Sequence, residues 1–125
     1  MSDKSERKDD LRARTKWYAR ITIRLFVELQ KLKQEELRIL GRQFLRSGTS
    51  VAANYREASR ARSDAEFISK IETCSQEADE TLLWMELLSE ECGIKSENLN
   101  FLLKESDELI AIFTTMSKNV KKRIK

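Results

Sequence analysis

A segment of small and hydroxyl-bearing residues in the middle of the chain runs Arg46-Ser47-Gly48-Thr49-Ser50-Val51-Ala52-Ala53-Asn54-Tyr55-Arg56-Glu57-Ala58. Such a composition is poor for a helix, because glycine adds backbone freedom and Ser, Thr and Asn offer the backbone competing hydrogen bonds. The apolar spacing around it is nevertheless helical. Gly48 and Ala52 are four residues apart and Gly41 lies seven before Gly48, so small residues line one stripe of this helix. We therefore predict that close packing against a neighbouring helix holds the segment.

Polar side chains within the segment are expected to complete that packing. Ser47, Thr49, Ser50 and Asn54 are predicted to form hydrogen bonds across a helix interface, and Arg46 and Glu57 to pair with charges on the following helix such as Glu77 or Glu80. The predicted helix-packing motif comprises Ser47, Gly48, Ser50, Ala52, Asn54 and Glu57. The alternative, a catalytic or phosphate-cradling site, needs a glycine-rich loop before a helix or a base beside the nucleophile. The sequence contains neither pattern.

Composition places the whole chain in the all-α class. Its 125 residues suit a single domain, 1–125, and it has 36% charged residues, three glycines and no proline, so turns are scarce. Apolar residues at alternating steps of three and four predict helices at about 10–31, 35–61, 64–92 and 96–122. We predict an antiparallel up-down-up-down four-helix bundle.

Local signals mark two of the three helix boundaries. Ser63 followed by Glu66 forms a capping box, and Gly93 supplies the left-handed residue that commonly follows a helix. The boundary at 31–36 has neither glycine nor proline, so its position is less well defined. Cys74 and Cys92 would lie about 27 Å apart on one helix, too far for a disulfide, and are interpreted as buried thiols.

Composition also narrows the function classes. Histidine is absent, which removes the commonest general base and metal ligand, so we predict a protein that is not an enzyme, with no catalytic residue, metal or cofactor. No window approaches the roughly 18 apolar residues of a membrane span, and the segment 1–10 is highly charged and lacks an apolar signal core. A cytoplasmic protein without a membrane partner is expected.

Several large apolar residues fall outside the main helical faces. By the helical repeat of about 100° per residue, they project away from the predicted core, and they are Ile23, Phe26, Leu83, Trp84 and Leu87. Exposed apolar patches usually bind a partner. We predict that these residues form an oligomer interface, with imperfect amphipathicity as the alternative.

The charge is divided strongly along the chain. Residues 42–63 carry five arginines against one glutamate, residues 64–91 carry nine acids against one lysine, and residues 118–125 carry five bases and no acid. One interpretation is that basic and acidic helices complement each other within or between subunits. The other is nucleic-acid binding. Its predicted residues are Lys118, Lys121, Lys122, Arg123, Lys125, Arg42, Arg46, Arg56, Arg60 and Arg62.

Three groups of residues carry a resemblance to a known family. The first is the segment 43–58, the second comprises Arg62, Ser63, Phe67 and Lys70, and the third comprises Glu77, Ala78, Glu80, Thr81, Trp84 and Leu87. The chain is similar over nearly its whole length to the small four-helix-bundle proteins encoded in intervening sequences of bacterial 23S rRNA genes. That resemblance implies an up-down bundle assembling into a ring, a homopentamer. A more distant similarity is to the accessory variability proteins of diversity-generating retroelements, which bind nucleic acid and a reverse transcriptase.

Two functions follow as hypotheses. The first is a homo-oligomeric accessory protein that binds RNA or DNA electrostatically, with a reverse transcriptase as a potential partner. The second is a protein-interaction or assembly module without a nucleic-acid role. Affinity for RNA at low salt discriminates between them.

Overall fold

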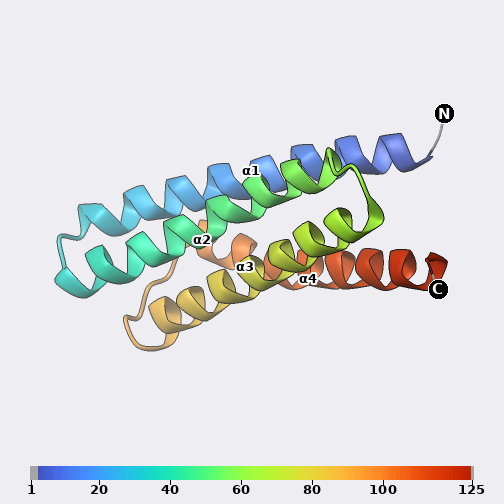
Figure 1. The fold of residues 1–125 in the computed structure, drawn as a ribbon. Helices are drawn as coiled ribbons and strands as arrows, with labels where there is room; N and C mark the ends of the chain where they lie inside the picture. Colours follow the sequence, from blue (N-terminus) through green and yellow to red (C-terminus); the bar gives the residue numbers. More distant parts are fainter. Residues whose placement is uncertain (1–2, 125) are drawn as a thin grey trace.

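Four helices make up the chain in the computed structural model, which describes the backbone of residues 3–124 and the side chains of residues 10–124. They are α1 (Asp3–Lys31), α2 (Glu35–Ser59), α3 (Asp64–Glu90) and α4 (Glu97–Arg123). The described residues contain no strand. The α1–α2 and α3–α4 turns lie at one end of the molecule, and the α2–α3 turn and both termini lie at the other (Figure 1). None of the four helices has an apolar run of the length that a membrane crossing needs.

Seven of the eight helix ends lie within two residues of the predicted ones, and the exception is the start of α1. α1 begins at Asp3 rather than near residue 10, because the charged segment before residue 10 contains no helix breaker. α2 ends at Ser59 and α3 at Glu90, each two residues before the predicted end.

Side-chain and glycine signals produce the two later turns. The Ser63 hydroxyl accepts a hydrogen bond from the Glu66 amide at 3.1 Å, so half of the predicted capping box is formed. Gly93 has a φ of 66°, the left-handed conformation common after a helix, and beyond it the Ile94 amide donates to the Leu88 carbonyl at 3.0 Å, so the chain folds back on the last turn of α3. The α1–α2 turn instead places Lys33 in the left-handed region, with a φ of 53°.

The core draws on the predicted apolar face of every helix. Its largest fully buried side chains include Tyr18 of α1, Tyr55 and Phe44 of α2, Met85 of α3 and Phe113 of α4. The rings of Tyr55 and Phe113 stack with their centroids 6.2 Å apart.

One layer of this core is polar and takes a hydroxyl from each helix. Tyr18 Oη lies 2.6 Å from Ser106 Oγ, and Thr81 Oγ1 lies 2.7 Å from Ser47 Oγ. All four residues are buried. Burial raises the pKa of Tyr18 to about 12, so its hydroxyl keeps its proton. A satisfied polar layer of this kind favours one alignment of the four helices over others.

The segment at 46–58 packs closely, as predicted, at Gly48. A Cβ built there would lie 2.6 Å from Thr22 Cγ2 and 2.8 Å from Thr22 Oγ1, so glycine permits the close approach of α1 and α2. Ser47 forms the predicted bond across helices, to Thr81.

The other three hydrogen bonds predicted across the interface are wrong. Thr49, Ser50 and Asn54 instead bond the carbonyls of Leu45, Arg46 and Ser50 within α2. Short polar side chains on a helix reach the carbonyl one turn back more easily than they reach a neighbouring helix.

The predicted ion pairs of Arg46 and Glu57 with charges on α3 are confirmed. Arg46 pairs with Glu77 at 3.4 Å and with Glu80, whereas Glu57 pairs with Lys70 at 2.7 Å. Basic α2 and acidic α3 therefore complement each other along part of their length.

Each helix packs against its neighbours in sequence, and α1 also meets α4 along a looser seam. Polar contacts hold that seam at two places. Arg14 Nε donates to Glu105 at 2.6 Å and Arg14 also bonds Glu108, while at the other end Glu28 accepts from Ser96 at 2.8 Å and from Asn98.

Candidate nucleic-acid interface

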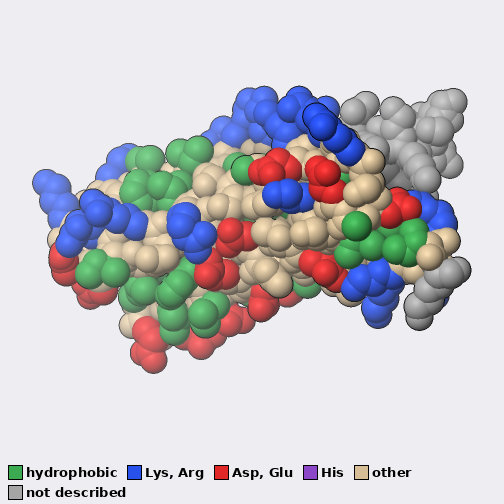
Figure 2. Space-filling view, viewed as in Figure 1, with side chains coloured by type: hydrophobic (Ala, Val, Ile, Leu, Met, Phe, Trp, Pro, Cys, Tyr) green, Lys and Arg blue, Asp and Glu red, His purple; other side chains and the backbone are tan. Residues whose placement is uncertain are grey.

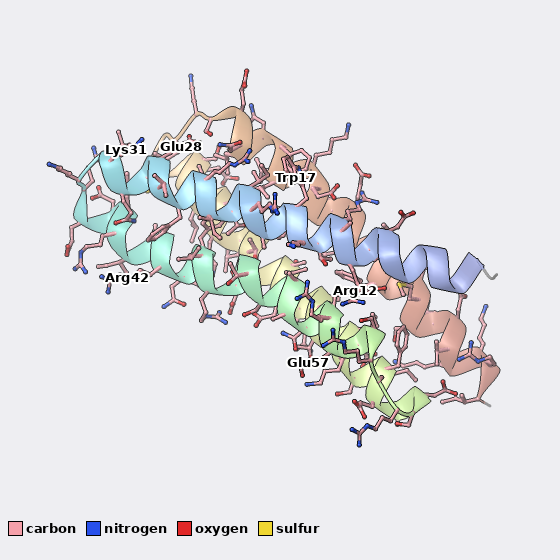
Figure 3. All side chains as sticks on the ribbon, turned by 90° about the horizontal axis from the view of Figure 1, so that it is seen from above. Arg12, Trp17, Glu28, Lys31, Arg42 and Glu57 are labelled. Carbon is pink, nitrogen blue, oxygen red and sulfur yellow. The ribbon has the colours of Figure 1, made fainter. Side chains whose placement is uncertain are left out.

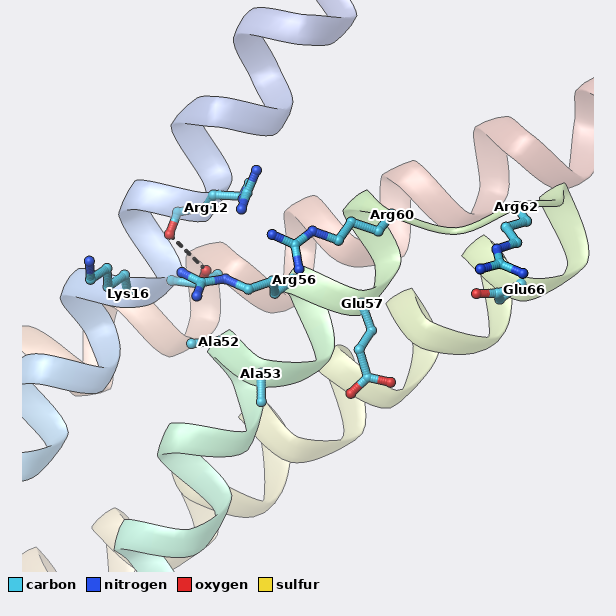
Figure 4. Close-up of a pocket in the computed structure, with 10 residues that line it drawn as sticks. Arg12, Lys16, Ala52, Ala53, Arg56, Glu57, Arg60, Arg62 and Glu66 are labelled. Carbon is cyan, nitrogen blue, oxygen red and sulfur yellow. Dashed lines mark hydrogen bonds between the residues drawn. The ribbon is translucent and has the colours of Figure 1, made fainter.

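A basic groove lies between α1 and α2 at the end of the bundle that holds the α2–α3 turn. Its basic side chains are Arg12 and Lys16 of α1, Arg56 and Arg60 of α2, and Arg62 of the turn (Figure 4). The groove has a volume of about 770 Å³. Ala52 and Ala53 occupy part of its wall, and because their side chains are short they leave room between the long basic ones.

Helical spacing explains why these residues gather. Arg12 and Lys16 are four residues apart on α1, and Arg56 and Arg60 are four apart on α2, so each pair projects from one face of its helix. The packing of α1 on α2 then brings the two pairs to the same groove.

The positive charge of the groove is largely unopposed. Within the side chains described, residues 10–124, none of the five basic residues forms an ion pair. The groove has two acidic residues, Glu57 and Glu66. Glu57 already forms an ion pair with Lys70, and its hydrogen bond and negative charge raise the pKa of that lysine. The arrangement attracts a polyanion, and within residues 10–124 no ion pair of a basic groove residue has to break for one to bind.

A row of basic residues extends from the groove along α1. Arg20 and Arg24 continue the spacing of four from Arg12 and Lys16, which places successive side chains about 6 Å apart along the helix. Both are exposed, and Lys and Arg side chains form a band over α1 in Figure 2. We call Arg12, Lys16, Arg20 and Arg24 the α1 basic row. The sequence analysis did not predict the α1 basic row as a binding surface, although its regular spacing of four residues indicates one basic face of a helix.

Comparison with known proteins assigns the family. The family model for the 23S rRNA-intervening sequence protein matches residues 17–115. The chain belongs to this family. The resemblance found in the sequence is thereby confirmed.

A solved structure supports the same assignment. The chain is similar to a Bacteroides thetaiotaomicron protein of unknown function from the S23 ribosomal protein family, with 32% sequence identity and a TM-score of 0.77. The match covers 86% of this chain and 97% of that one. No curated protein matches.

In this member of the 23S rRNA-intervening sequence family, two predicted binding residues of α2 lie outside the groove. Arg46 is engaged by Glu77 and Glu80 of α3. Arg42 is exposed and lies toward the α1–α2 turn, as Figure 3 shows. Arg56, Arg60 and Arg62 are thus the predicted α2 residues that the structure brings together.

The basic residues 118–125, predicted to form a C-terminal tail, lie in the last turns of α4 as far as Arg123 and are partly paired with α3; we keep the name tail for them. Lys121 lies 2.6 Å from Glu72 and lowers the pKa of that carboxyl by its hydrogen bond, and Arg123 lies 3.1 Å from Asp64. Lys118 and Lys122 are exposed and form no ion pair within the described part of the chain, and Lys125 lies outside the described residues.

The predicted oligomer-interface residues occupy two separate faces. Ile23 of α1 is 48% exposed and Leu83 of α3 is 46% exposed, but α1 and α3 are not adjacent helices in the bundle. Phe26, Trp84 and Leu87 are only partly exposed, and Trp84 packs against the core. Its indole nitrogen is buried and forms no hydrogen bond among the residues described. Trp84 therefore contributes to the core more than the helical repeat suggested.

The described cysteines and acidic residues form neither a low-pKa thiol nor a metal-binding group. Both cysteines are free, and burial raises the pKa of Cys74 to about 12, which disfavours its thiolate. Cys92, predicted to be buried, is partly exposed. Among the described residues, no three cysteine or acidic side chains are grouped so that they could hold a metal ion.

Proposed function

We propose that this protein is a non-enzymatic, homo-oligomeric accessory protein that binds RNA or DNA through backbone phosphates. The observation that carries the proposal is the groove of Arg12, Lys16, Arg56, Arg60 and Arg62, whose charges have no ion-pair partner within residues 10–124. Binding of this kind depends on charge and spacing, so it is expected to be largely independent of base sequence.

The dependence of the binding affinity on salt concentration gives a quantitative test of the proposal. Five phosphate contacts correspond to a log–log slope of affinity against salt of about −4.5, a loss of several hundred-fold between about 50 and 200 mM. An oligomer multiplies this effect, because it presents several copies of the groove to one strand.

The experiment measures binding of a labelled structured RNA by fluorescence anisotropy at both salt concentrations. The triple variant Arg12→Gln/Lys16→Gln/Arg56→Gln is expected to weaken binding at low salt and to bring the slope to about −1.8. The matched control, Lys31→Gln/Lys33→Gln/Lys95→Gln, removes the same charge from exposed sites outside the groove. Equal loss in both triple variants would show that only net charge matters, and absence of wild-type binding would refute the function.

The tail is tested separately with a chain that ends at Ser117. Lys121 and Arg123 already have acidic partners on α3, so this truncation is expected to reduce the affinity less than the groove variant does. A larger reduction in affinity would show that the main binding site is the tail and not the groove.

The assembly that we propose is a ring of antiparallel up-down-up-down bundles, a pentamer as the family resemblance implies. A ring uses two different surfaces of each subunit, one meeting the other. Exposed apolar side chains on two different helices, Ile23 on α1 and Leu83 on α3, support such a pair of contact surfaces. Leu83→Glu is expected to give smaller species in sedimentation velocity, and unchanged mass would refute the role of this face.

A reverse transcriptase is the partner that the distant resemblance suggests. The alternative function, an assembly module without a nucleic-acid role, draws support from the same exposed Ile23 and Leu83. Intact oligomers without RNA affinity at low salt would favour it.

A further inference from the structure

Two exposed aromatic side chains lie on the seam between α1 and α4, and no feature of the fold accounts for them. Trp17 of α1 is 43% exposed and Phe101 of α4 is 40% exposed, whereas most other aromatic residues of the chain belong to the core. Burying such a ring is favourable, so exposure at two places on one seam calls for an explanation.

The hydrogen bonds of α1 locate Trp17. Arg14 and Glu28 both contact α4, and Trp17, Ile21 and Arg24 lie between them at steps of three and four, hence on the same face of α1. Ile21 is buried. Trp17 and Arg24 therefore lie at the solvent-exposed edge of the seam, one before and one after the buried Ile21 along α1.

The hydrogen bonds of α4 locate Phe101 in the same way. Asn98 contacts Glu28 and Glu105 contacts Arg14. Phe101 lies three residues after Asn98 and four before Glu105, so it occupies the α1-facing side of α4. The seam thus carries an aromatic ring on each helix.

Arginine connects the aromatic seam to the basic surface. The Arg24 guanidinium lies 5.2 Å from the centre of the Trp17 ring, in cation–π distance, and Arg24 also ends the α1 basic row. Trp17 lies on the α4 side of α1, whereas Arg12, the first residue of the row, lies on its α2 side (Figure 3). At about 100° per residue, a spacing of four turns the row gradually around α1, away from the groove with α2 and toward the seam with α4. A strand whose phosphates follow the row would therefore reach Trp17 at Arg24.

We propose that Trp17, with Arg24 and Phe101, forms a stacking site for unpaired bases, so that the favoured ligand is single-stranded nucleic acid. This inference rests on the proposed function and adds the class of nucleic acid. Proteins that bind single strands combine a basic track with aromatic rings on which bases stack, and this surface offers both. A duplex keeps its base faces stacked inside and cannot use the rings.

The test compares affinities for a single-stranded oligonucleotide of about 20 thymidines and for a duplex of the same length, measured by fluorescence anisotropy at low salt. Trp17→Ala is expected to weaken single-strand binding by about 5- to 150-fold, the size of one lost stacking contact. Duplex binding and both salt slopes should stay the same, because no charge changes. Ile39→Ala, which truncates another half-exposed apolar side chain on α2, is the matched control and should bind as wild type.

A second variant reports direct contact with the base. Trp17→Phe keeps a ring and should retain most of the single-strand affinity. The chain has two tryptophans, and only Trp17 is proposed to stack, so quenching of tryptophan emission by the oligonucleotide should disappear in Trp17→Phe. Persistence of the quenching would overturn the assignment of Trp17.

The outcomes separate the inference from the function on which it rests. If wild type binds both ligands and Trp17→Ala leaves single-strand binding unchanged, the stacking site is refuted while electrostatic binding stands. If wild type binds neither ligand, both are refuted. If Trp17→Ala lowers the mass in sedimentation, the seam is a subunit interface and the stacking site is wrong.

Discussion

Replacing Gly48 with alanine tests how closely α1 and α2 are required to approach. The added Cβ would lie 2.6 Å from Thr22 Cγ2 and 2.8 Å from Thr22 Oγ1, well inside van der Waals contact. Thr22 is fully buried, and its hydroxyl donates to the Tyr18 carbonyl at 2.8 Å, so the side chain cannot rotate away without losing that bond. The clash has to be relieved by moving the helices apart.

The expected free-energy change is the difference between two opposing effects. In an unobstructed helix, glycine to alanine stabilises by about 1 kcal/mol. Overpacking a close-packed interior costs about 1–3 kcal/mol, and two contacts below 3.0 Å with a buried side chain place this site toward the upper end. Gly48→Ala should therefore lower the free energy of unfolding by about 1–2 kcal/mol, or Tm by roughly 4–8 °C.

Gly41→Ala is the matched control on the same helix. A Cβ at Gly41 meets the end of the flexible Gln30 side chain at 3.0 Å and the Phe26 ring at 3.5 Å. The helix propensity gain should dominate there, leaving stability unchanged or raised by up to about 1 kcal/mol.

Urea unfolding of the single and double variants completes the test. Thr22→Ala removes the two closest atoms and leaves Thr22 Cβ at 3.2 Å from the new methyl, so Thr22→Ala/Gly48→Ala should be more stable than the sum of the single changes by about 1 kcal/mol or more. A Gly48→Ala protein as stable as wild type, or strict additivity with Thr22→Ala, would refute close packing as the reason for this glycine.

Three further changes have defined outcomes in urea unfolding. Lys33→Gly should stabilise by about 1 kcal/mol, because Lys33 has a φ of 53° that only glycine adopts without strain. Burial raises the pKa of Cys74 to about 12, whereas a thiol in the unfolded chain has a pKa of roughly 8.5. As the pH rises, this thiol therefore ionises first in the unfolded chain. The free energy of unfolding should fall from about pH 8.5 upward, by up to about 1.4 kcal/mol per pH unit. Cys74→Ala should flatten this fall below about pH 10, where tyrosine begins to ionise. Tyr18→Phe should cost about 1–2 kcal/mol by leaving the buried Ser106 hydroxyl without that partner, and adding Ser106→Ala should cost less than the sum of the single changes.

The sequence predicted those parts of the fold that depend on local signals. Ser63 and Gly93 act within a few residues of themselves, so the ends of α2, α3 and α4 could be predicted within about two residues. The α1–α2 turn has no such residue, yet the apolar spacing still predicted its bounds, the end of α1 at Lys31 and the start of α2 at Glu35. The left-handed conformation of Lys33 could not be predicted, because it does not follow from the preference of lysine. Trp84 was misplaced because the helical repeat gives a direction but not how closely the neighbouring helix approaches.

The groove could be predicted only in part, because it depends on residues that are 40 or more positions apart. Arg56, Arg60 and Arg62 were recognisable as a basic cluster within one segment. Their partners Arg12 and Lys16 join them only through the packing of α1 on α2. Conversely, Arg46 belongs to the same basic segment and was predicted to bind nucleic acid. The packing of α2 on α3 instead pairs it with Glu77 and Glu80.

The segment at 46–58 connects the scaffold with the proposed binding surface. At Gly48 the absence of a side chain lets α1 and α2 touch, and one turn later Ala52 still presents only a methyl group. The two helices therefore stay close where the groove begins, while the long side chains of Lys16 and Arg56 reach along its walls. A larger residue at Gly48 would separate the helices and spread the positive charges, which weakens the potential that several charges share. Nucleic-acid affinity is then expected to fall together with stability in Gly48→Ala, although that substitution alters no charge.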